Sequence, residues 1–255
     1  MPDLPFWRSA LLESAGYRAR FFGREGGVSE GHFRSLNLSA REEGHPDHLA
    51  ENERRVLAAL ETDSLYLPAQ VHGKRVRQLT HKEPAVVRGS EGDAVVTGVP
   101  GQAIGVLTAD CVPILIGAVD GRAAGVIHAG WRSLLAGIIG ETVERLTRAF
   151  SLEPGDVAAA VGPAIGPKNY EVNRDLALAF LHERFDLTAV IWPDRRRKPH
   201  MDLRLMAVKD LLHAGLVSQS IEIVGPTTFD ERLFSHRRDG GQTGRQLSAI
   251  VVPGG

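Results

Sequence analysis

The sequence predicts a mixed α/β (α+β) fold, and three observations support this prediction. Short runs of strand-forming residues are interspersed with longer segments whose apolar residues recur at helical spacing, a mixture typical of sheets combined with helices. Of the 255 residues, 43% are hydrophobic, which is enough apolar material for a large core. No linker rich in proline and serine divides the chain. We therefore expect residues 1–255 to form a single domain.

The N-terminal quarter of the chain is predicted to hold one strand and one helix. Residues 17–22 form a strand-like run that ends at a glycine-rich turn over residues 23–27. Residues 47–61 are expected to form an amphipathic helix, because their apolar positions recur at helical spacing. Those positions are Leu49, Val56, Leu57 and Leu60.

The rest of the chain alternates between short strands and helices. Strand-like runs separated by glycine, proline or aspartate span residues 75–79, 94–96, 104–107, 112–116 and 123–127. Further strands are expected at residues 157–161, 221–224 and 247–252, and a helix at residues 137–150. Two more helices have N-cap residues: Asn173 begins one that runs to about residue 184, and Asp202 begins one that ends before Gly215.

Charge and composition narrow the class of partner. The 30 Lys and Arg residues nearly balance the 31 Asp and Glu residues, for a net charge of −1. This balance disfavours a nucleic acid or an anionic membrane as partner and favours a small-molecule substrate. The longest apolar run, about residues 112–119, is far too short to span a membrane. The sequence leaves the oligomeric state open.

The N-terminal segment and the cysteine content favour a cytoplasmic protein. Arg8 and Glu13 interrupt the apolar residues of the first segment, so no signal-peptide core is expected. The single cysteine cannot form an internal disulfide, as is typical of a reducing compartment. One run of charges, residues 194–198, includes Arg195, Arg196 and Arg197 and is best interpreted as a solvated loop rather than a ligand-binding segment.

Cys111 is the first candidate for chemistry. It lies between two apolar strand-like runs, and His128 stands at the end of the next run. If residues 112–116 and 123–127 pair as a hairpin, Cys111 and His128 will face each other at one edge of the sheet. The alternative is a purely structural role, in which a lone cysteine is buried and its thiol acts as a small hydrophobic side chain.

His72 completes a possible metal site. It lies between a proline-containing turn and the next predicted strand. With Cys111 and His128 it supplies three protein ligands, the number that a catalytic zinc uses while one position stays open. Glycine at position 130 would let the backbone approach a ligand closely.

Three other types of site compete with zinc. A cysteine nucleophile activated by His128 would need no metal. A blue-copper centre adds an axial methionine, and Met1, Met201 and Met206 all lie far from these motifs in the sequence. A multicopper oxidase is disfavoured, because the chain lacks the many histidines and His-x-His pairs that such enzymes use.

Ten segments together resemble the laccase-domain (YfiH-like) family, in the same order and over nearly the whole chain. They are Arg24-Glu25-Gly26-Gly27-Val28-Ser29, Ser35-Leu36-Asn37-Leu38, Gln70-Val71-His72-Gly73, Gly92-Asp93-Ala94, Thr108-Ala109-Asp110-Cys111-Val112-Pro113, His128-Ala129-Gly130-Trp131-Arg132, Gly162-Pro163-Ala164-Ile165-Gly166, Tyr170-Glu171-Val172, Phe234-Ser235-His236-Arg237-Arg238-Asp239 and Thr243-Gly244-Arg245. This ordered set is far more specific than any single motif.

The resemblance implies a fold, an activity and a metal. The fold would be a layered α/β structure with central sheets flanked by helices. The activity would be that of a purine nucleoside phosphorylase acting on adenosine, inosine, guanosine and methylthioadenosine with phosphate, together with adenosine deamination. Zinc would bind His72, Cys111 and His128, with Cu²⁺ as an alternative metal.

Candidate roles for other residues follow from the chemistry of these two reactions. Deamination needs a proton carrier beside the metal, and Asp93 and Asp110 are the candidates. Asp110 is equally suited to orient a ligating histidine, and the sequence leaves both roles open. No Walker-type loop is present, so side chains would have to hold phosphate, with Arg132 favoured. The weaker phosphate or substrate candidates are Arg24, Asn37, Trp131, Tyr170, Arg237 and Arg238.

Two further functions remain as alternatives. The resemblance also admits a metal-dependent hydrolase that edits UDP-muramoyl peptidoglycan precursors, in which residues 195–198 would help to bind the diphosphate. A non-catalytic metal-binding module would instead bind zinc with no open coordination position. Products formed from adenosine and from a UDP-muramoyl substrate would separate the three.

Overall fold

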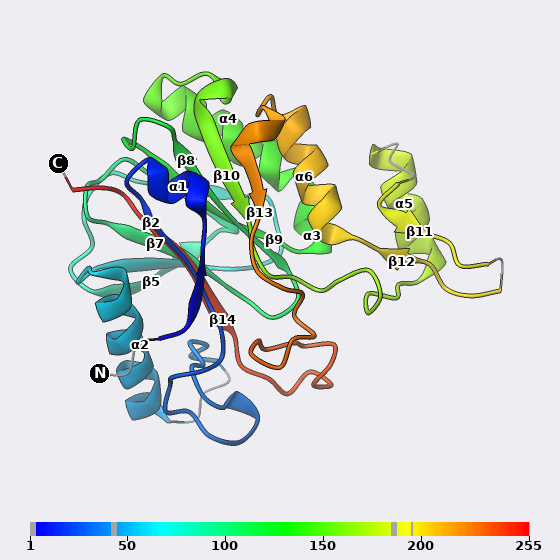
Figure 1. Cartoon of the computed structure of the whole chain (residues 1–255), viewed down its shortest axis with the longest axis horizontal. Coiled ribbons are helices and arrows are strands. Elements are labelled where there is room, and N and C mark those ends of the chain that lie inside the picture. The colour runs from blue at the N-terminus through cyan, green and yellow to red at the C-terminus, as the bar shows by residue number, and fades with distance from the viewer. Residues whose placement is uncertain (1–3, 42–44, 185–187, 195, 255) are drawn as a thin grey trace.

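Two mixed β-sheets packed face to face form the centre of the protein (Figure 1). The structure is a computed structural model that describes residues 4–41, 45–184, 188–194 and 196–254. Helices cover the outer face of each sheet, so the architecture has four layers in the order helix, sheet, sheet, helix. This arrangement confirms the predicted mixed α/β fold with layered sheets flanked by helices.

The first sheet has the strand order β1-β2-β14-β7-β3-β5. Its strands are β1 (Phe6–Arg8), β2 (Arg18–Phe22), β3 (Leu65–Ala69), β5 (Val86–Glu91), β7 (Ala103–Thr108) and β14 (Gln246–Val251). The helix α2 (Pro46–Leu60) packs on its outer face through Val56 and Leu60. The sheet joins the two ends of the chain, because β14 pairs with both β2 and β7.

The second sheet has the strand order β13-β10-β8-β9-β6-β4 and carries most of the candidate site. Its strands are β4 (Val76–Leu79), β6 (Ala94–Thr97), β8 (Val112–Ala118), β9 (Ala124–Ala129), β10 (Val157–Val161) and β13 (Ile221–Ile223). A separate two-stranded ribbon pairs β11 (Val190–Ile191) with β12 (His200–Met201). The remaining α-helices are α1 (Ala10–Ser14), α3 (Trp131–Leu135), α4 (Ile138–Phe150), α5 (Arg174–Arg184) and α6 (Leu203–His213).

Strand β8 shows how the sequence pattern builds these layers. Val112, Ile114 and Ile116 point toward the helices on the outer face, whereas Leu115 packs in the core between the two sheets. Successive side chains of a strand point to opposite faces, so a strand buried on both faces is apolar throughout. This double burial explains the continuous apolar runs in the middle of the chain, and it makes the hairpin β8–β9 a rigid support.

The predicted Asp202 cap, the Gly215 helix end and the antiparallel pairing of the two central strands are confirmed. The carboxylate of Asp202 accepts a hydrogen bond from the backbone N–H of Leu205 at 3.0 Å and caps α6. Gly215 follows that helix with φ +96°, the left-handed conformation that a glycine at this position adopts without strain. Strands β8 and β9 pair antiparallel, with Pro113 opposite His128.

The predicted solvated loop lies between β11 and β12. Arg195 lies outside the described residues, but Arg196, Arg197 and Lys198 are all exposed. Two backbone N–H groups of this loop donate to the carboxylate of Asp194, which shapes the turn. In the part of the chain that the structure describes, no helix has both the length and the apolar character needed to cross a membrane.

Candidate metal centre

His72, Cys111 and His128 converge at one edge of the second sheet. Cys111 directly precedes β8, His128 lies near the end of the paired strand β9, and His72 comes from the loop after β3. Their ligand atoms all lie within 4.8 Å of one another, and the Sγ of Cys111 is 3.9 Å from the Nε2 of His72. Among the described residues, this is the one group of three or more His, Cys, Asp or Glu side chains with metal-binding geometry. The predicted ligand set is thus brought together.

Gly130 leaves the space that this group needs. A Cβ atom placed on Gly130 would lie 2.9 Å from the Cδ2 of His72 and 3.1 Å from the Sγ of Cys111. Both distances are shorter than ordinary van der Waals contacts, so any side chain would push the ligands apart. The glycine in the loop after β9 is therefore required by the packing of the site.

Asp93 holds two of the three candidate ligands from behind. One carboxylate oxygen accepts hydrogen bonds from the Nδ1 of His128 at 2.8 Å and from the backbone N–H of His72 at 2.9 Å. The other oxygen accepts from the backbone N–H of Gly73 at 2.7 Å, and the whole side chain is buried. Asp93 leaves the Nε2 of His128 available for a metal, as a carboxylate behind a ligating histidine does.

The pKa of Asp93 is consistent with this supporting role. Burial would raise the pKa of the carboxyl, but the hydrogen bonds from His128 and Gly73 outweigh burial and lower it. The residue therefore stays ionised and accepts hydrogen bonds only. The arrangement places Asp93 behind the ligands, with both oxygens in use.

Unusual backbone conformations mark the same site. Among the described residues, four that are not glycine have positive φ: Glu61, His72, Asp110 and Ser151. Glu61 and Ser151 simply cap the C-terminal ends of α2 and α4. His72 at φ +60° and Asp110 at φ +96° do not cap a helix: His72 is itself a candidate ligand, and Asp110 directly precedes the ligand Cys111. Backbone strain of this kind persists where the surrounding structure imposes it, most often at functional sites.

The charges of Cys111 and His128 stabilise each other. Burial raises the pKa of the Cys111 thiol, but the charge of His128 and hydrogen bonds from both histidines outweigh this effect and bring it to about 6. Burial likewise lowers the pKa of His128, yet the Cys111 thiolate and Asp93 bring it up to about 9. At neutral pH the sulfur is thus a thiolate, which is the form that binds a metal.

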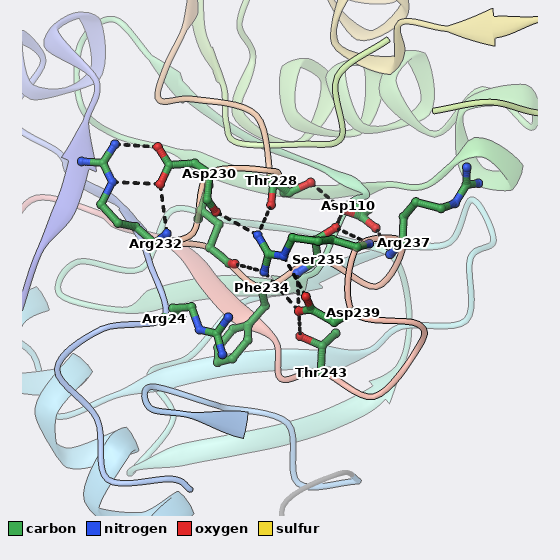
Figure 2. Close-up of polar contacts among 12 residues, drawn as sticks. Arg24, Asp110, Thr228, Asp230, Arg232, Phe234, Ser235, Arg237, Asp239 and Thr243 are labelled. Atoms are coloured by element: carbon green, nitrogen blue, oxygen red, sulfur yellow. Dashed lines mark hydrogen bonds and ion pairs between the residues drawn. The ribbon is translucent and has the colours of Figure 1, made fainter. Parts of the chain in front are cut away.

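Asp110 is bound to the C-terminal part of the chain rather than to a ligating histidine. Its Oδ1 accepts hydrogen bonds from the hydroxyls of Thr228 at 2.5 Å and Ser235 at 2.7 Å, and its Oδ2 accepts from the backbone N–H of Arg237 at 2.7 Å. Its carbonyl oxygen accepts from the backbone N–H of Ile165 at 3.0 Å. Figure 2 shows the carboxylate enclosed by these donors.

Two arginines on the rim of the site stack on aromatic rings. The guanidinium of Arg132 lies 4.1 Å from the ring centroid of Trp131, and that of Arg237 lies 5.2 Å from that of Tyr170. Arg132 is exposed, and its guanidinium forms no hydrogen bond or ion pair with any residue that the structure describes. Arg237 donates from Nη1 to the carbonyl of Glu171 at 2.9 Å, and its Nε and Nη2 have no partner among the described residues.

Tyr170 connects these cations to the candidate ligands. Burial raises the pKa of Tyr170 to about 12, and the negative charges of Cys111 and Asp110 add to this effect. Arg237 and Arg132 act in the opposite direction, so both cations are close enough to Tyr170 to influence its charge. The Tyr170 hydroxyl has no hydrogen-bond partner among the described residues. Tyr170 therefore lies within the electrostatic influence of both the two arginines and the acidic groups of Cys111 and Asp110.

Arg24 and Asn37 form contacts with loop residues of the chain. Arg24 donates from Nε to the carbonyl of Arg34 at 2.7 Å and lies over the ring of Phe234 at 4.7 Å. Asn37 is fully buried, and its Oδ1 accepts from the backbone N–H of Arg245 at 2.9 Å. The low exposure of Asn37 and the contacts of both residues suit roles in packing the loops.

Arg238 has no N–H donor left for a substrate. Its Nε and its Nη2 each donate one hydrogen bond to the carboxylate of Asp239. The others go to the carbonyls of Thr228, Asp230 and Leu233. A guanidinium has five N–H donors, and all five are occupied here (Figure 2). In this structure the Arg238 guanidinium therefore holds the loop together and has no N–H group left for a phosphate.

Sequence reasoning did not identify Thr228 and Ser235 as part of this site. They lie 118 and 125 residues from Asp110 along the chain. A hydroxyl residue in a loop carries no local signal of a partner so far away, and only the fold brings the two together.

Comparison with known proteins is consistent with this geometry. Residues 18–253 match the family model described as multi-copper polyphenol oxidoreductase laccase. The chain is 37% identical over 234 residues to a protein of Escherichia coli named purine nucleoside phosphorylase YfiH, covering 89% of this chain and 90% of that protein. It is 34% identical over 254 residues to a purine nucleoside phosphorylase of Deinococcus radiodurans, covering 99% and 94% of the two chains.

Solved structures show the same fold. YlmD of Geobacillus stearothermophilus superposes with a TM-score of 0.88 at 28% sequence identity, covering 99% of this chain and 100% of that one. The protein YfiH of Bacillus licheniformis gives a TM-score of 0.84 at 28% identity over 94% of each chain. These similarities confirm the resemblance drawn from the motifs: the chain belongs to the laccase-domain (YfiH-like) family, whose model is described as multi-copper polyphenol oxidoreductase laccase.

Proposed function

We propose that this protein is a zinc-dependent purine nucleoside phosphorylase with adenosine deaminase activity. The observation that carries the proposal is the convergence of three metal-binding side chains with two stacked arginines around Tyr170. The relatives named purine nucleoside phosphorylase support the choice of substrate. The substrates would be adenosine, inosine, guanosine and methylthioadenosine, each with inorganic phosphate.

The chemistry of the donors fits zinc. Two imidazoles and one thiolate are ligands that zinc accepts, whereas calcium and magnesium prefer oxygen. We propose His72, Cys111 and His128 as the ligands, with Asp93 fixing the ring orientation and tautomer of His128. Bound zinc would supply a Lewis acid that polarises the substrate. Cu²⁺ is the alternative metal, since copper also binds imidazole and thiolate ligands.

Arg132 and Arg237 are proposed to hold the phosphate. In phosphorolysis a phosphate oxygen forms a bond to the anomeric carbon of the ribose, while the bond from that carbon to the purine nitrogen breaks. The phosphate must therefore be positioned beside the sugar, which guanidinium groups do well. The free N–H donors of Arg132 and Arg237 support this role, and the aromatic rings beneath them restrict their motion.

The roles of the two aromatic residues differ. Trp131 is half-buried and one side of its ring is covered by Arg132, which supports a role as a platform for that cation. The hydroxyl of Tyr170 has no protein partner among the described residues and can therefore donate to the substrate. We propose that Tyr170 contacts either the phosphate or the purine, whereas Asp93 has a supporting role behind the metal ligands.

The other candidate functions have weaker support. A hydrolase acting on a UDP-muramoyl precursor would need cations for the diphosphate, but Arg197 pairs with Asp194 and Lys198 pairs with Glu171. A non-catalytic module would enclose its metal, yet His72 is exposed and Cys111 is half-buried. A multicopper oxidase would need several metal centres, and the described residues provide one candidate group.

One preparation can test the proposal. Elemental analysis should find about one zinc per chain, as expected for a single three-ligand site. The same preparation should release adenine from adenosine in the presence of phosphate, and inosine in its absence. Zinc without either product would contradict the purine function and favour the cell-wall precursor. We also propose a cytoplasmic location, which the single thiol supports.

A further inference from the structure

Asp110 occupies a special position between the candidate metal ligands and the C-terminal part of the chain. It directly precedes Cys111 and adopts φ +96°, and its side chain is buried to 9% exposure. Both carboxylate oxygens accept hydrogen bonds from the segment 228–239, through Thr228, Ser235 and the N–H of Arg237. An ionised carboxylate makes strong bonds of this kind. A single residue thus connects the turn at Cys111 to a segment more than 100 residues away.

The segment 228–239 is itself closed by the guanidinium of Arg238. That group binds three carbonyls of the segment as well as Asp239, and Asp239 also accepts from the hydroxyl of Thr243 at 2.7 Å. Figure 2 shows Asp239 and Thr243 on one side of Ser235 and Asp110 on the other. Because these hydrogen bonds cross-link the segment, a contact that holds Thr228 or Ser235 also restrains the neighbouring residues.

The contact with Asp110 directly involves the backbone of Arg237. The backbone N–H of Arg237 binds Asp110, while its side chain lies over Tyr170 and reaches the carbonyl of Glu171. In Figure 2 the Arg237 side chain extends away from the Asp110 network. The backbone contact and the side-chain contact together determine where the guanidinium stands relative to Cys111.

We propose that Asp110 is a positioning residue that holds Arg237 beside the metal ligands so that Arg237 binds the substrate phosphate. This inference rests on the proposed function of the site. It assigns no proton transfer to Asp110, because every hydrogen bond that the structure gives its carboxylate is to a group of the segment 228–239. The sequence left two roles open for Asp110, as a proton carrier or as the partner of a ligating histidine. The proposal replaces both with the positioning of Arg237.

Asparagine and alanine at position 110 separate positioning from proton transfer. In Asp110→Asn, the amide oxygen can accept from the N–H of Arg237 while the amide nitrogen donates to the hydroxyls of Thr228 and Ser235, since a hydroxyl accepts as well as donates. The variant keeps the shape of the network but cannot carry a proton as a carboxylate does. Asp110→Ala removes both the hydrogen-bond network and the carboxylate. The double variant Thr228→Val/Ser235→Ala removes two hydrogen-bond donors while Asp110 stays in place.

The measurements are made on zinc-loaded proteins. They are phosphate affinity by titration calorimetry, kcat and KM for phosphate and for inosine, and zinc content. We expect Asp110→Asn to bind phosphate within about threefold of wild type. Asp110→Ala and the Thr228/Ser235 double variant should bind it roughly tenfold more weakly, as for the loss of hydrogen bonds to a charged group. Zinc content and KM for inosine should not change.

A thermodynamic cycle with Arg237 sharpens the test. If Asp110 acts through Arg237, then adding Asp110→Ala to Arg237→Ala should cause no further loss of phosphate affinity. Asp120→Asn is the matched control, because Asp120 is an exposed aspartate in the turn at the other end of the β8–β9 hairpin. It should behave as wild type in every assay.

Several results would overturn the proposal. If Asp110→Asn is as inactive as Asp110→Ala while the Thr228/Ser235 double variant is normal, Asp110 carries a proton. Unchanged phosphate affinity in Asp110→Ala would show that Arg237 does not depend on it. Wild-type protein that binds phosphate but phosphorolyses no nucleoside would contradict the proposed function alone. In that case, weaker binding in the Asp110→Ala and double variants would still support the positioning role.

Discussion

Asp93 accepts a hydrogen bond from the Nδ1 of His128 at 2.8 Å, and the same oxygen accepts from the backbone N–H of His72 at 2.9 Å. One buried carboxylate thus orients a ligand on strand β9 and the loop that carries a second ligand. The contact fixes the ring of His128 and the backbone of His72, which stands in an exposed loop with a positive φ. The rigidity of the candidate metal centre depends on this contact.

Replacing Asp93 by Ala should therefore weaken zinc binding. Loss of a hydrogen-bond partner behind a metal ligand typically costs roughly 10–100-fold in metal affinity. Competition with a chromophoric chelator measures the affinity directly. Asp63→Ala is a matched control, since Asp63 is exposed and pairs with Lys82 on the surface. Equal zinc affinity in Asp93→Ala and wild type would contradict the supporting role.

Replacing His72 or Cys111 by Ala should abolish zinc binding and turnover together. Each change leaves only two protein ligands, fewer than catalytic zinc sites use. Zinc content, phosphorolysis and deamination are to be measured on the same preparations. His81→Ala is a suitable control, because His81 lies in an exposed position beyond β4. Full activity of a metal-free Cys111→Ala protein would refute the zinc-dependent mechanism.

Replacing Gly130 by Ala tests the packing of the site without removing a ligand. The new Cβ would lie 2.9 Å from the Cδ2 of His72 and 3.1 Å from the Sγ of Cys111, so both ligands must shift. We expect lower zinc affinity and lower kcat while the fold is kept. Gly140→Ala in helix α4 is the matched control, because a Cβ there meets nothing within 4 Å and alanine favours a helix. The variant at position 140 should keep full activity and gain slightly in thermal stability.

Much of the site was predictable from the sequence, and the reason lies in strands β8 and β9. Their apolar runs are long enough to be recognised and the turn between them is short, so their pairing predicted that Cys111 and His128 meet at one edge of the sheet. In the structure Pro113 is the residue opposite His128, and Cys111 lies two residues before it at the same edge. Strand β3 was missed because Pro68 interrupts it, and β5 because it is a polar edge strand that contains Gly89. Helix α3 has only five residues, too few for a periodic signal.

The roles of the two aspartates could not be predicted for a different reason. Asp93 and Asp110 both lie within recognised motifs, and nothing in the local sequence tells a buried hydrogen-bond acceptor from a proton carrier. The partners of Asp110 lie in a segment that only the chain's return from β13 to β14 brings near. Such contacts depend on tertiary structure and leave no periodic pattern.

The metal-free protein should show an unusually reactive thiol at neutral pH. The pKa of Cys111 is about 6, whereas an unperturbed cysteine has a pKa of about 8.5. The thiolate, which is the nucleophile, therefore forms above about pH 6. Alkylation by iodoacetamide after removal of zinc should rise with a midpoint near pH 6, and added zinc should protect. His128→Ala removes the main attractive charge and should move the midpoint upward.

The same pair of charges predicts how the stability of the metal-free protein depends on pH. The folded-state pKa of Cys111 is depressed to about 6, so its contribution is complete above about 8.5 and is lost as the pH falls through about 6. The folded-state pKa of His128 is raised to about 9, so its contribution is complete below about 6.5 and is lost as the pH rises through about 9. Between pH 6 and 9 both groups are charged, and stability should be greatest there. Chemical denaturation across this range measures the effect. Cys111→Ser should flatten the profile, and an unchanged profile would contradict the ion pair.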